Sequence, residues 1–354
     1  MSENPKILFL YSELAGYSIA CLNALVSAGA EVHVVRKPVN NEAPFVFENE
    51  TSVRYYERGK FNRQLLMELV LKIKPALIVV SGWVDKDYLA VSRNYRKQAT
   101  QVLVFDNQWT GSIRQRMACL VAKYAIIGHF DAVWVPGERQ IEFAERLGFK
   151  DGEIYPGFYS CDSKLYSSFY DQSRHLKEKH FPRRFVFVGR YYEFKGILDL
   201  WKAFTELYLQ GECKWELWCL GTGDLVPVEY PGIRHFGFVQ PDQMEDIIQQ
   251  TGVFILPSHF EPWGVAVQEF ATAGFPLICS DEVGAADAFL KEESNGYGFK
   301  SGNVQDLKRS MKRIMGLSDE KLIEMARQSH LLGTRINPES WALTALSMAG
   351  LKRQ

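Results

Sequence analysis

Short apolar runs that alternate with helix-compatible segments are the feature that most restricts how this chain can fold. In the first half, six such runs are expected to be strands: 7–11, 31–35, 76–81, 101–105, 132–135 and 153–155. Strands that alternate with helices build doubly wound, mostly parallel sheets. A second alternation begins at Arg184. The sequence therefore predicts an α/β protein with two Rossmann-like domains of parallel sheet.

The length and composition agree with two domains. The chain has 354 residues, of which 47% are hydrophobic, and this is enough to fill two cores. We expect a first domain over 1–160, a linker over the polar segment 161–180, and a second domain over 181–337. No internal repeat or low-complexity tract is apparent.

Several classes of protein are disfavoured by composition. The formal net charge of −1 gives no general attraction to nucleic acid. The six cysteines show no paired spacing, so neither a disulfide framework nor a zinc site is indicated, and a cytoplasmic location is expected. The first residues lack the pattern of a secretion signal, and no apolar run approaches the roughly 20 residues that span a bilayer.

The segment 258–269 carries the strongest functional signal. It follows an apolar run, 252–257, that is typical of a buried parallel strand, and it leads into a helix-compatible stretch from Val265. Free backbone N–H groups at such a helix start, near Gly264, Val265 and Ala266, favour an anion. A diphosphate is the expected ligand there.

Two carboxylates flank this helix start. Glu261 precedes it and Glu269 lies in its second turn, with Trp263 between them. Carboxylates accept hydrogen bonds from hydroxyl groups, which suits a sugar on one side and a ribose on the other. The alternative is that Glu261 only complements the helix dipole and that Glu269 is an exposed helix residue.

These residues resemble the Glu, seven residues, Glu signature of retaining GT-B glycosyltransferases of the group-1, or family 4, class. Upstream, 185–190 followed by 193–196 is similar to the family's strand ending in Gly-Arg and its Glu-x-Lys-Gly motif. Residues 221–224, 235–239 and 273–284 follow in family order. The match is good over about 185–303 and holds only in outline in the first half.

The resemblance implies two domains that face a central cleft, with the donor mainly on the second domain and the acceptor on the first. It also implies that a last helix, at about 338–354, packs back on the first domain. Arg190 and Lys195 would hold the donor diphosphate, Glu261 the transferred sugar and Glu269 the ribose. The residues expected to bind the donor are Gly16, Gly189, Gly221, Val239, Glu261, Trp263, Gly264, Val265, Ala266 and Glu269.

The first half departs from the family at two loops. Gly16 stands where relatives often have paired glycines, and it either approaches the diphosphate or forms an ordinary strand-to-helix turn. After the strand 101–105, where many relatives place a histidine, this chain has Asp106. Asp106 would bind donor or acceptor hydroxyls or act as a base, and its alternative is a turn aspartate.

No metal or cofactor is expected. Asp85 and Asp87 have the spacing of a metal-binding Asp-x-Asp, but a pair of acids at a helix start explains them better. The resemblance implies a retaining transfer, which needs either a carboxylate nucleophile or front-face displacement. Nothing in the sequence identifies a nucleophile. We therefore expect front-face displacement, in which Arg190, Lys195 and helix N–H groups stabilise charge on the leaving diphosphate.

The segment 112–130 leaves two interpretations open. It combines Arg114, Arg116 and Lys123 with several apolar residues, and the preceding helix ends in further cations. Such a helix either rests on an anionic membrane that holds a lipid-linked acceptor, or packs its apolar face on its own sheet.

Taken together, the sequence predicts a hexosyltransferase that uses a nucleoside-diphosphate sugar and a saccharide or lipid-linked saccharide acceptor, in cell-envelope polysaccharide or lipopolysaccharide synthesis. Nucleic acid is not an expected partner. Peripheral contact with the inner membrane is one of the two interpretations left open for the segment 112–130. The alternatives are a nucleotide-sugar epimerase on the same fold and a non-catalytic sugar-nucleotide-binding assembly protein.

Overall fold

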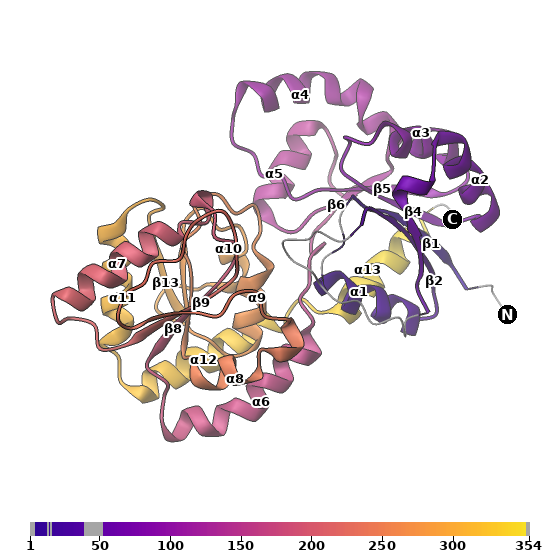
Figure 1. The fold of residues 1–354 in the computed structure, drawn as a ribbon. Coiled ribbons are helices and arrows are strands. Elements are labelled where there is room, and N and C mark those ends of the chain that lie inside the picture. Colours follow the sequence, from indigo (N-terminus) through magenta and orange to yellow (C-terminus); the bar gives the residue numbers. More distant parts are fainter. Residues whose placement is uncertain (1–3, 13, 15, 39–51, 352–354) are drawn as a thin grey trace. The chain divides into compact units, whose positions relative to one another are not determined.

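The structure, a computed structural model, describes residues 4–12, 14, 16–38 and 52–351. The chain divides into two compact units: Met1–Ser160 with Ile336–Gln354, and Cys161–Arg335. Each unit is an α/β layer structure built on one parallel sheet (Figure 1). The predicted fold class of two parallel-sheet domains is thus confirmed.

Within the described residues, the first unit holds a seven-stranded sheet in the order β3-β2-β1-β4-β5-β6-β7, and every neighbouring pair is parallel. The strands are β1 (Lys6–Leu10), β2 (Glu31–Arg36), β3 (Arg54–Glu57), β4 (Leu77–Ser81), β5 (Thr100–Val104), β6 (Ala132–Trp134) and β7 (Ile154–Tyr155). All six strands predicted from the sequence are present, and the edge strand β3 is additional.

Side chains alternate along these strands between two cores. Ile7 and Phe9 of β1 face a core that also contains residues of α1 (Gly16–Ser27) and α13 (Pro338–Ala349). Leu8 and Leu10 face the opposite core. The helices on that side are α2 (Arg63–Ile73), α3 (Lys86–Tyr95), α4 (Ile113–Ala125) and α5 (Glu138–Leu147).

The last helix belongs to the first unit although it follows the second in sequence. Asn337 and Ser340 form a capping box at its start. Trp341 then packs on Trp134 with ring centroids 4.7 Å apart, and its indole N–H donates to the carbonyl oxygen of Phe158. These aromatic contacts anchor α13 beside α1.

The second unit, whose residues are all described, has a six-stranded parallel sheet in the order β10-β9-β8-β11-β12-β13. Its strands are β8 (Arg184–Val188), β9 (Glu216–Leu220), β10 (Ile233–His235), β11 (Val253–Leu256), β12 (Leu277–Ser280) and β13 (Gly296–Phe299). The helices are α6 (Ser163–Lys179), α7 (Ile197–Leu209), α8 (Glu245–Gln250), α9 (Val265–Thr272), α10 (Ala286–Phe289), α11 (Val304–Met315) and α12 (Asp319–Gly333).

The segment 161–180, expected to be a linker, is instead occupied by α6. Asp162 caps this helix by accepting from the N–H of Leu165, and α6 packs against α8, α9 and α12. It buries Lys177, whose ammonium lies 3.7 Å from the centre of the Phe275 ring. Burial lowers the Lys177 pKa to about 7. Despite its polar composition, the segment is therefore a helix that packs against its unit.

Candidate functional site

The loops that follow neighbouring strands of the second sheet are tied together by backbone hydrogen bonds. The N–H of Gly189, after β8, donates to Leu220 at 3.0 Å, and the N–H of Gly221, after β9, donates to Gly237 at 2.6 Å. These loops lie at the carboxyl ends of the strands, where ligands bind in open α/β sheets. Gly189 and Gly221 thus belong to one surface with the loop that contains Val239.

Gly221 is required by the close approach of two loops. Its φ of 135° lies in the region that favours glycine, and a Cβ built on it would be 1.9 Å from the carbonyl oxygen of Gly189. No side chain fits in this space. At Gly189 and Gly221 the two loops therefore offer only backbone to whatever lies above the sheet.

Lys195 and Glu261 are brought into direct contact. Lys195 is the last residue of η3 (Glu193–Lys195), and its ammonium donates a hydrogen bond to Glu261 Oε2. The two side chains are only 19% and 13% exposed. Glu261 is also held through its backbone, because its carbonyl oxygen accepts from the N–H of Gly284 at 2.9 Å. The pair is therefore fixed at the strand ends.

A second set of contacts joins the loops after β8 and β11. The N–H of His259 donates to the carbonyl oxygen of Phe194 at 2.8 Å, and His259 Nε2 lies 2.7 Å from Asp199 Oδ2 at the start of α7. Gly196 (φ 67°) has no room for a Cβ, which would be 1.9 Å from the carbonyl oxygen of Pro257. His259 and Asp199 position these loops, and the sequence analysis did not single out their pairing.

Helix α9 starts beside Glu261. Gly264 is its N-cap residue, and no side chain caps it, so the positive end of the helix is made of backbone N–H groups. Val265 and Ala266 form its first turn and are partly exposed. The predicted strand, loop and helix are all present here.

Glu269 lies in the second turn of α9 and is partly buried. Burial raises its pKa to about 7, and a hydrogen bond from Tyr166 opposes that rise. Tyr166 comes from α6, and its own pKa is well above the usual range because it is buried. The sequence analysis missed Tyr166 because it assigned the segment to a linker.

Two other predicted residues differ in accessibility. Arg190 follows β8 and is exposed at the carboxyl end of that strand. Trp263 is only 3% exposed and packs its ring edge-on against Phe289, 6.1 Å between ring centroids. Trp263 thus supports the loop from beneath and offers a ligand no open ring face.

In the first unit, a cavity of about 550 Å³ opens at the ends of β1, β4 and β5. Asp106 lines it and accepts a hydrogen bond from the Tyr159 hydroxyl at 3.3 Å. Burial raises the Tyr159 pKa well above its usual range, and the nearby Tyr17 and Asp106 add to this rise. The remaining polar lining comes from Ser12, Lys37, Ser81, Asp85, Tyr88 and Asn107.

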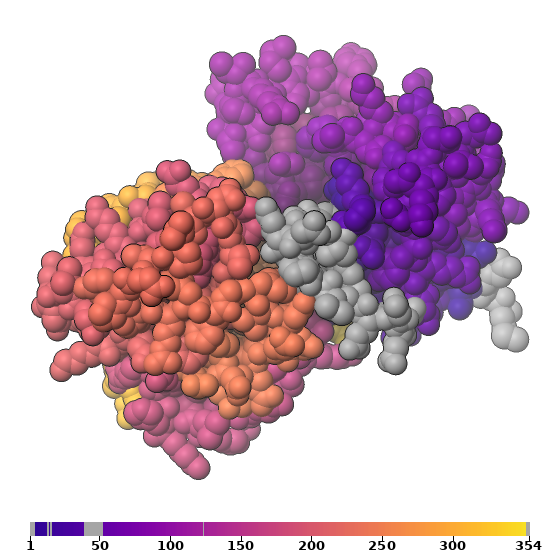
Figure 2. Space-filling view, viewed as in Figure 1, coloured from indigo at the N-terminus to yellow at the C-terminus, as the bar shows by residue number. Residues whose placement is uncertain are grey.

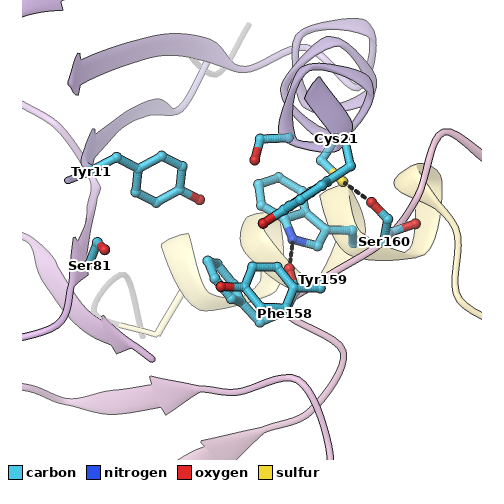
Figure 3. A pocket seen from close by; sticks show the side chains of 9 residues that line it. Tyr11, Cys21, Ser81, Phe158, Tyr159 and Ser160 are labelled. Atoms are coloured by element: carbon cyan, nitrogen blue, oxygen red, sulfur yellow. Dashed lines mark hydrogen bonds between the residues drawn. The ribbon is translucent and has the colours of Figure 1, made fainter. Parts of the chain in front are cut away.

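A smaller cavity of about 50 Å³ lies next to Tyr159 (Figure 3). Tyr11, Ser81 and Cys21 contribute to its wall, and the Tyr11 hydroxyl points into the space. The Cys21 thiol donates to the carbonyl oxygen of Ser160 at 3.8 Å. Gly16 is the first residue of α1, directly before Tyr17 of this wall; residues 13 and 15 of its loop lie outside the described residues.

Asp85 and Asp87 serve the start of α3. Asp85 accepts from the N–H groups of Asp87 and Tyr88, and Arg58 donates to both carboxylates at 2.8 to 3.1 Å. The expected helix-start role of Asp85 is confirmed. Across the described part of the chain, no group of three or more His, Cys, Asp or Glu side chains is arranged to hold a metal ion.

The second unit carries the similarity to a known family. Residues 170–329 match the model of the family described as glycosyl transferases group 1. An uncharacterized glycosyltransferase of Methanocaldococcus jannaschii is 30% identical over 139 residues, which are 37% of this chain and 35% of that protein. The alignment thus spans about a third of the relative's length.

Solved structures resemble nearly the whole chain. Sucrose-phosphate synthase from Thermosynechococcus elongatus superposes with a TM-score of 0.73 at 18% identity, covering 97% of this chain and 98% of the other. HepE of Anabaena, solved with UDP and glucose, superposes with a TM-score of 0.72 at 14% identity over 97% and 99%. At these identities the likeness shows the fold, which is GT-B.

Proposed function

We propose that this chain is a glycosyltransferase that takes a hexose-type sugar from a nucleoside-diphosphate donor and passes it to a saccharide or lipid-linked saccharide. The family match over 170–329 supports the reaction class. The single observation that carries the proposal is the Lys195–Glu261 contact beside the uncapped start of α9. It combines a cation, a hydroxyl-binding carboxylate and free N–H groups at one strand edge.

In the proposed donor site, different residues bind the diphosphate, the transferred sugar and the nucleoside. Lys195, the exposed Arg190 and the N–H groups of Val265 and Ala266 bind the diphosphate, since cations and helix starts both favour anions. Glu261 accepts hydrogen bonds from the transferred sugar. The backbone of Gly189, Gly221 and Val239 borders the nucleoside. Gly16 is proposed as a further donor-binding residue.

Glu269 is proposed to bind the ribose. Its carboxylate accepts hydrogen bonds from a diol when it is ionised, and Tyr166 orients it. Trp263 acts by packing, because its ring is buried.

The reaction proposed is front-face displacement with retention. The bond from the anomeric carbon to the diphosphate oxygen breaks, and a bond to the acceptor oxygen forms on the same face. The acceptor's proton passes to the departing phosphate oxygen. Arg190 and Lys195 stabilise the negative charge that grows on the leaving group, and this preorganised electrostatic effect is the main source of rate. No metal ion is required in this proposal.

The acceptor is proposed to lie in the cavity of the first unit, with Asp106 binding its hydroxyl. UDP is the first nucleotide to test, because the Anabaena neighbour was solved with UDP and glucose. Cell-envelope polysaccharide assembly is the proposed setting. All six cysteines are free, in keeping with a cytoplasmic location.

The test is a calorimetric binding panel of UDP, GDP, ADP and their sugar conjugates in excess chelator, with Glu269→Ala measured beside the parent. Binding of one nucleotide, weakened in the variant, supports the donor site. If no nucleotide binds, the donor assignment fails and the assembly-protein alternative gains.

Turnover then separates the enzyme classes. A transferase consumes the bound donor sugar only when an acceptor is added, apart from slow hydrolysis. Conversion of the nucleotide sugar to its epimer without any acceptor would instead favour the epimerase alternative.

A further inference from the structure

Helix α4 carries its apolar side chains on the outside. Five of them are strongly exposed: Ile113 81%, Met117 57%, Leu120 70%, Val121 54% and Tyr124 82%. Their spacing of three or four residues places them on one face of the helix. Of the apolar residues in the segment 112–130, Met117, Leu120 and Val121 thus do not pack on the sheet, whereas Ile126 is buried in its core and Ile127 packs against that core.

The inner face of α4 is made of small and polar residues. Ala122 is fully buried against the core of the sheet, and Cys119 is partly buried beside it. An ordinary surface helix buries its large apolar residues and exposes its polar ones. Helix α4 instead exposes its large apolar residues, and it lies on the outer side of its unit (Figures 1 and 2).

Positive charge borders the exposed face. Arg114 and Arg116 are exposed on α4, and at about 100° per residue they fall on opposite sides of the apolar stripe. The sequence contains no Asp or Glu between Asp106 and Asp131. The face is therefore apolar at its centre and cationic at both margins.

The neighbouring helix adds to this charge. Arg93, Arg96 and Lys97 at the end of α3 are exposed. Arg96 donates to the carbonyl oxygen of Gly128 in η2 (Ile127–His129), directly after α4. Arg93 and Arg96 also lower the pKa of His129, second to its burial. The cations of α3 thus lie close to the C-terminal end of α4.

We propose that the exposed face of α4 binds the surface of a bilayer that contains anionic lipids. The five apolar side chains enter the boundary between headgroups and acyl chains, and Arg114 and Arg116 reach lipid phosphates at the margins. Tyr124 also fits the boundary between headgroups and acyl chains, because its ring is apolar and its hydroxyl remains hydrated. Charge complementarity selects this partner over an uncharged apolar surface. No helix in the described residues has the length and hydropathy to cross a membrane.

Flotation of the full chain with vesicles tests this proposal. The parent protein is expected to float with vesicles of equal parts phosphatidylcholine and phosphatidylglycerol and to stay behind with phosphatidylcholine alone. Leu120→Glu with Tyr124→Glu is expected to abolish flotation. Arg114→Gln and Arg116→Gln are each expected to weaken partitioning about fivefold, which corresponds to about 1 kcal/mol per cation.

The matched control is Leu209→Glu, an exposed apolar residue on α7, 75% exposed in the second unit. It should float as the parent does. All variants should keep the parent's melting temperature and nucleotide affinity, since these side chains make no core or donor contact.

Failure of the parent to float with anionic vesicles would overturn the proposal, as would unchanged flotation of the double variant. Self-association that Leu120→Glu abolishes, without vesicle binding, would assign the face to a second copy of the chain. None of these three results affects the donor-site proposal, which calorimetry tests separately.

Discussion

The Lys195 ammonium donates a hydrogen bond to the carboxylate of Glu261, which is 66 residues further along the chain. Strand β8 and strand β11 are neighbours in the sheet, so the loops that follow them meet. If this pair works as one unit on the donor, its two members should not act independently.

Lys195→Ala and Glu261→Gln are each expected to lower kcat/KM by about ten- to a hundredfold, because each removes a charge-assisted hydrogen bond. The double variant should lose much less than the product of the two factors. Steady-state kinetics with the nucleotide sugar that binds provides the measurement. Lys300→Ala, which breaks the exposed Lys300–Asp281 pair of the same unit, is the control and should keep full activity. Strictly multiplicative losses would show that the pair does not act together.

Nucleotide affinity should depend on the charge of Glu269. With a pKa of about 7, the carboxyl is mostly protonated at pH 6 and mostly ionised at pH 8. Because only the carboxylate accepts hydrogen bonds from both ribose hydroxyls, binding should tighten about tenfold over that interval. Calorimetry at both pH values checks this, and Glu269→Gln, which cannot ionise, removes the nucleotide's own titration from the comparison. An equal pH dependence in the two proteins would contradict the ribose role.

The same carboxyl should influence stability in the absence of ligand. Its pKa is raised from 4.5 to about 7 in the folded chain. The tighter proton binding of the folded chain therefore adds about 1 to 3 kcal/mol to the free energy of unfolding. This contribution is fully present below pH 4.5 and is lost as pH rises through 7. Urea unfolding at pH 5 and pH 8 should show that Glu269→Gln gains stability relative to the parent at the higher pH.

Lys177 should make the stability of the folded chain fall, rather than rise, as the pH is lowered. Its pKa is lowered from 10.5 to about 7, so the unfolded chain binds the proton more readily across that range. The parent should lose stability as pH falls from 10 towards 7, whereas Lys177→Met should not, because it fills the site over Phe275 without a charge. Melting curves at pH 7 and pH 9.5 measure the difference. A less stable Lys177→Met at pH 7 would mean that the ammonium is stabilising.

Gly196→Ala should damage the loop by steric conflict. Gly302 provides a matched control, because its φ of 71° is close to the 67° of Gly196 but a Cβ there has nothing within 4 Å. Gly302→Ala should cost only the strain of that φ, about 1 kcal/mol, and Gly196→Ala should cost several times more. Urea unfolding gives both values, and equal costs would show that the loop has room to move.

Asp106→Asn is expected to leave nucleotide affinity unchanged while it lowers transfer at least tenfold, since its place is in the cavity of the first unit. Tyr159→Phe removes only the hydroxyl that donates to Asp106 and should have a smaller effect. Binding and transfer are measured on the same preparations. Weaker nucleotide binding in Asp106→Asn would move this residue to the donor site.

The parallel sheets were predictable because their strands are buried on both faces and therefore appear as short apolar runs. Strand β3 was missed since it lies at the sheet edge and its four residues are exposed or partly buried. The sequence of α6 predicts a linker because exposed polar residues outnumber buried residues in it.

The donor-side residues could be identified from motifs, but their contacts could not. Local sequence does not encode that β8 lies next to β11, nor that Tyr166 of α6 reaches Glu269. The sequence likewise does not reveal that the apolar face of α4 is exposed. Helical spacing reveals an apolar face, but only the packing of Ala122 shows which face points inwards.

The position of α13 has a consequence for how the chain is made. Residues of the first unit are synthesised first, yet their core still lacks Trp341 until the ribosome has translated all of Cys161–Arg335. The later unit is contiguous and can therefore complete its core first, against the usual order of folding from the N-terminus. Until then the nascent first unit exposes the apolar surface of α1 and Trp134, so a translational arrest before residue 341 should leave it dependent on chaperones.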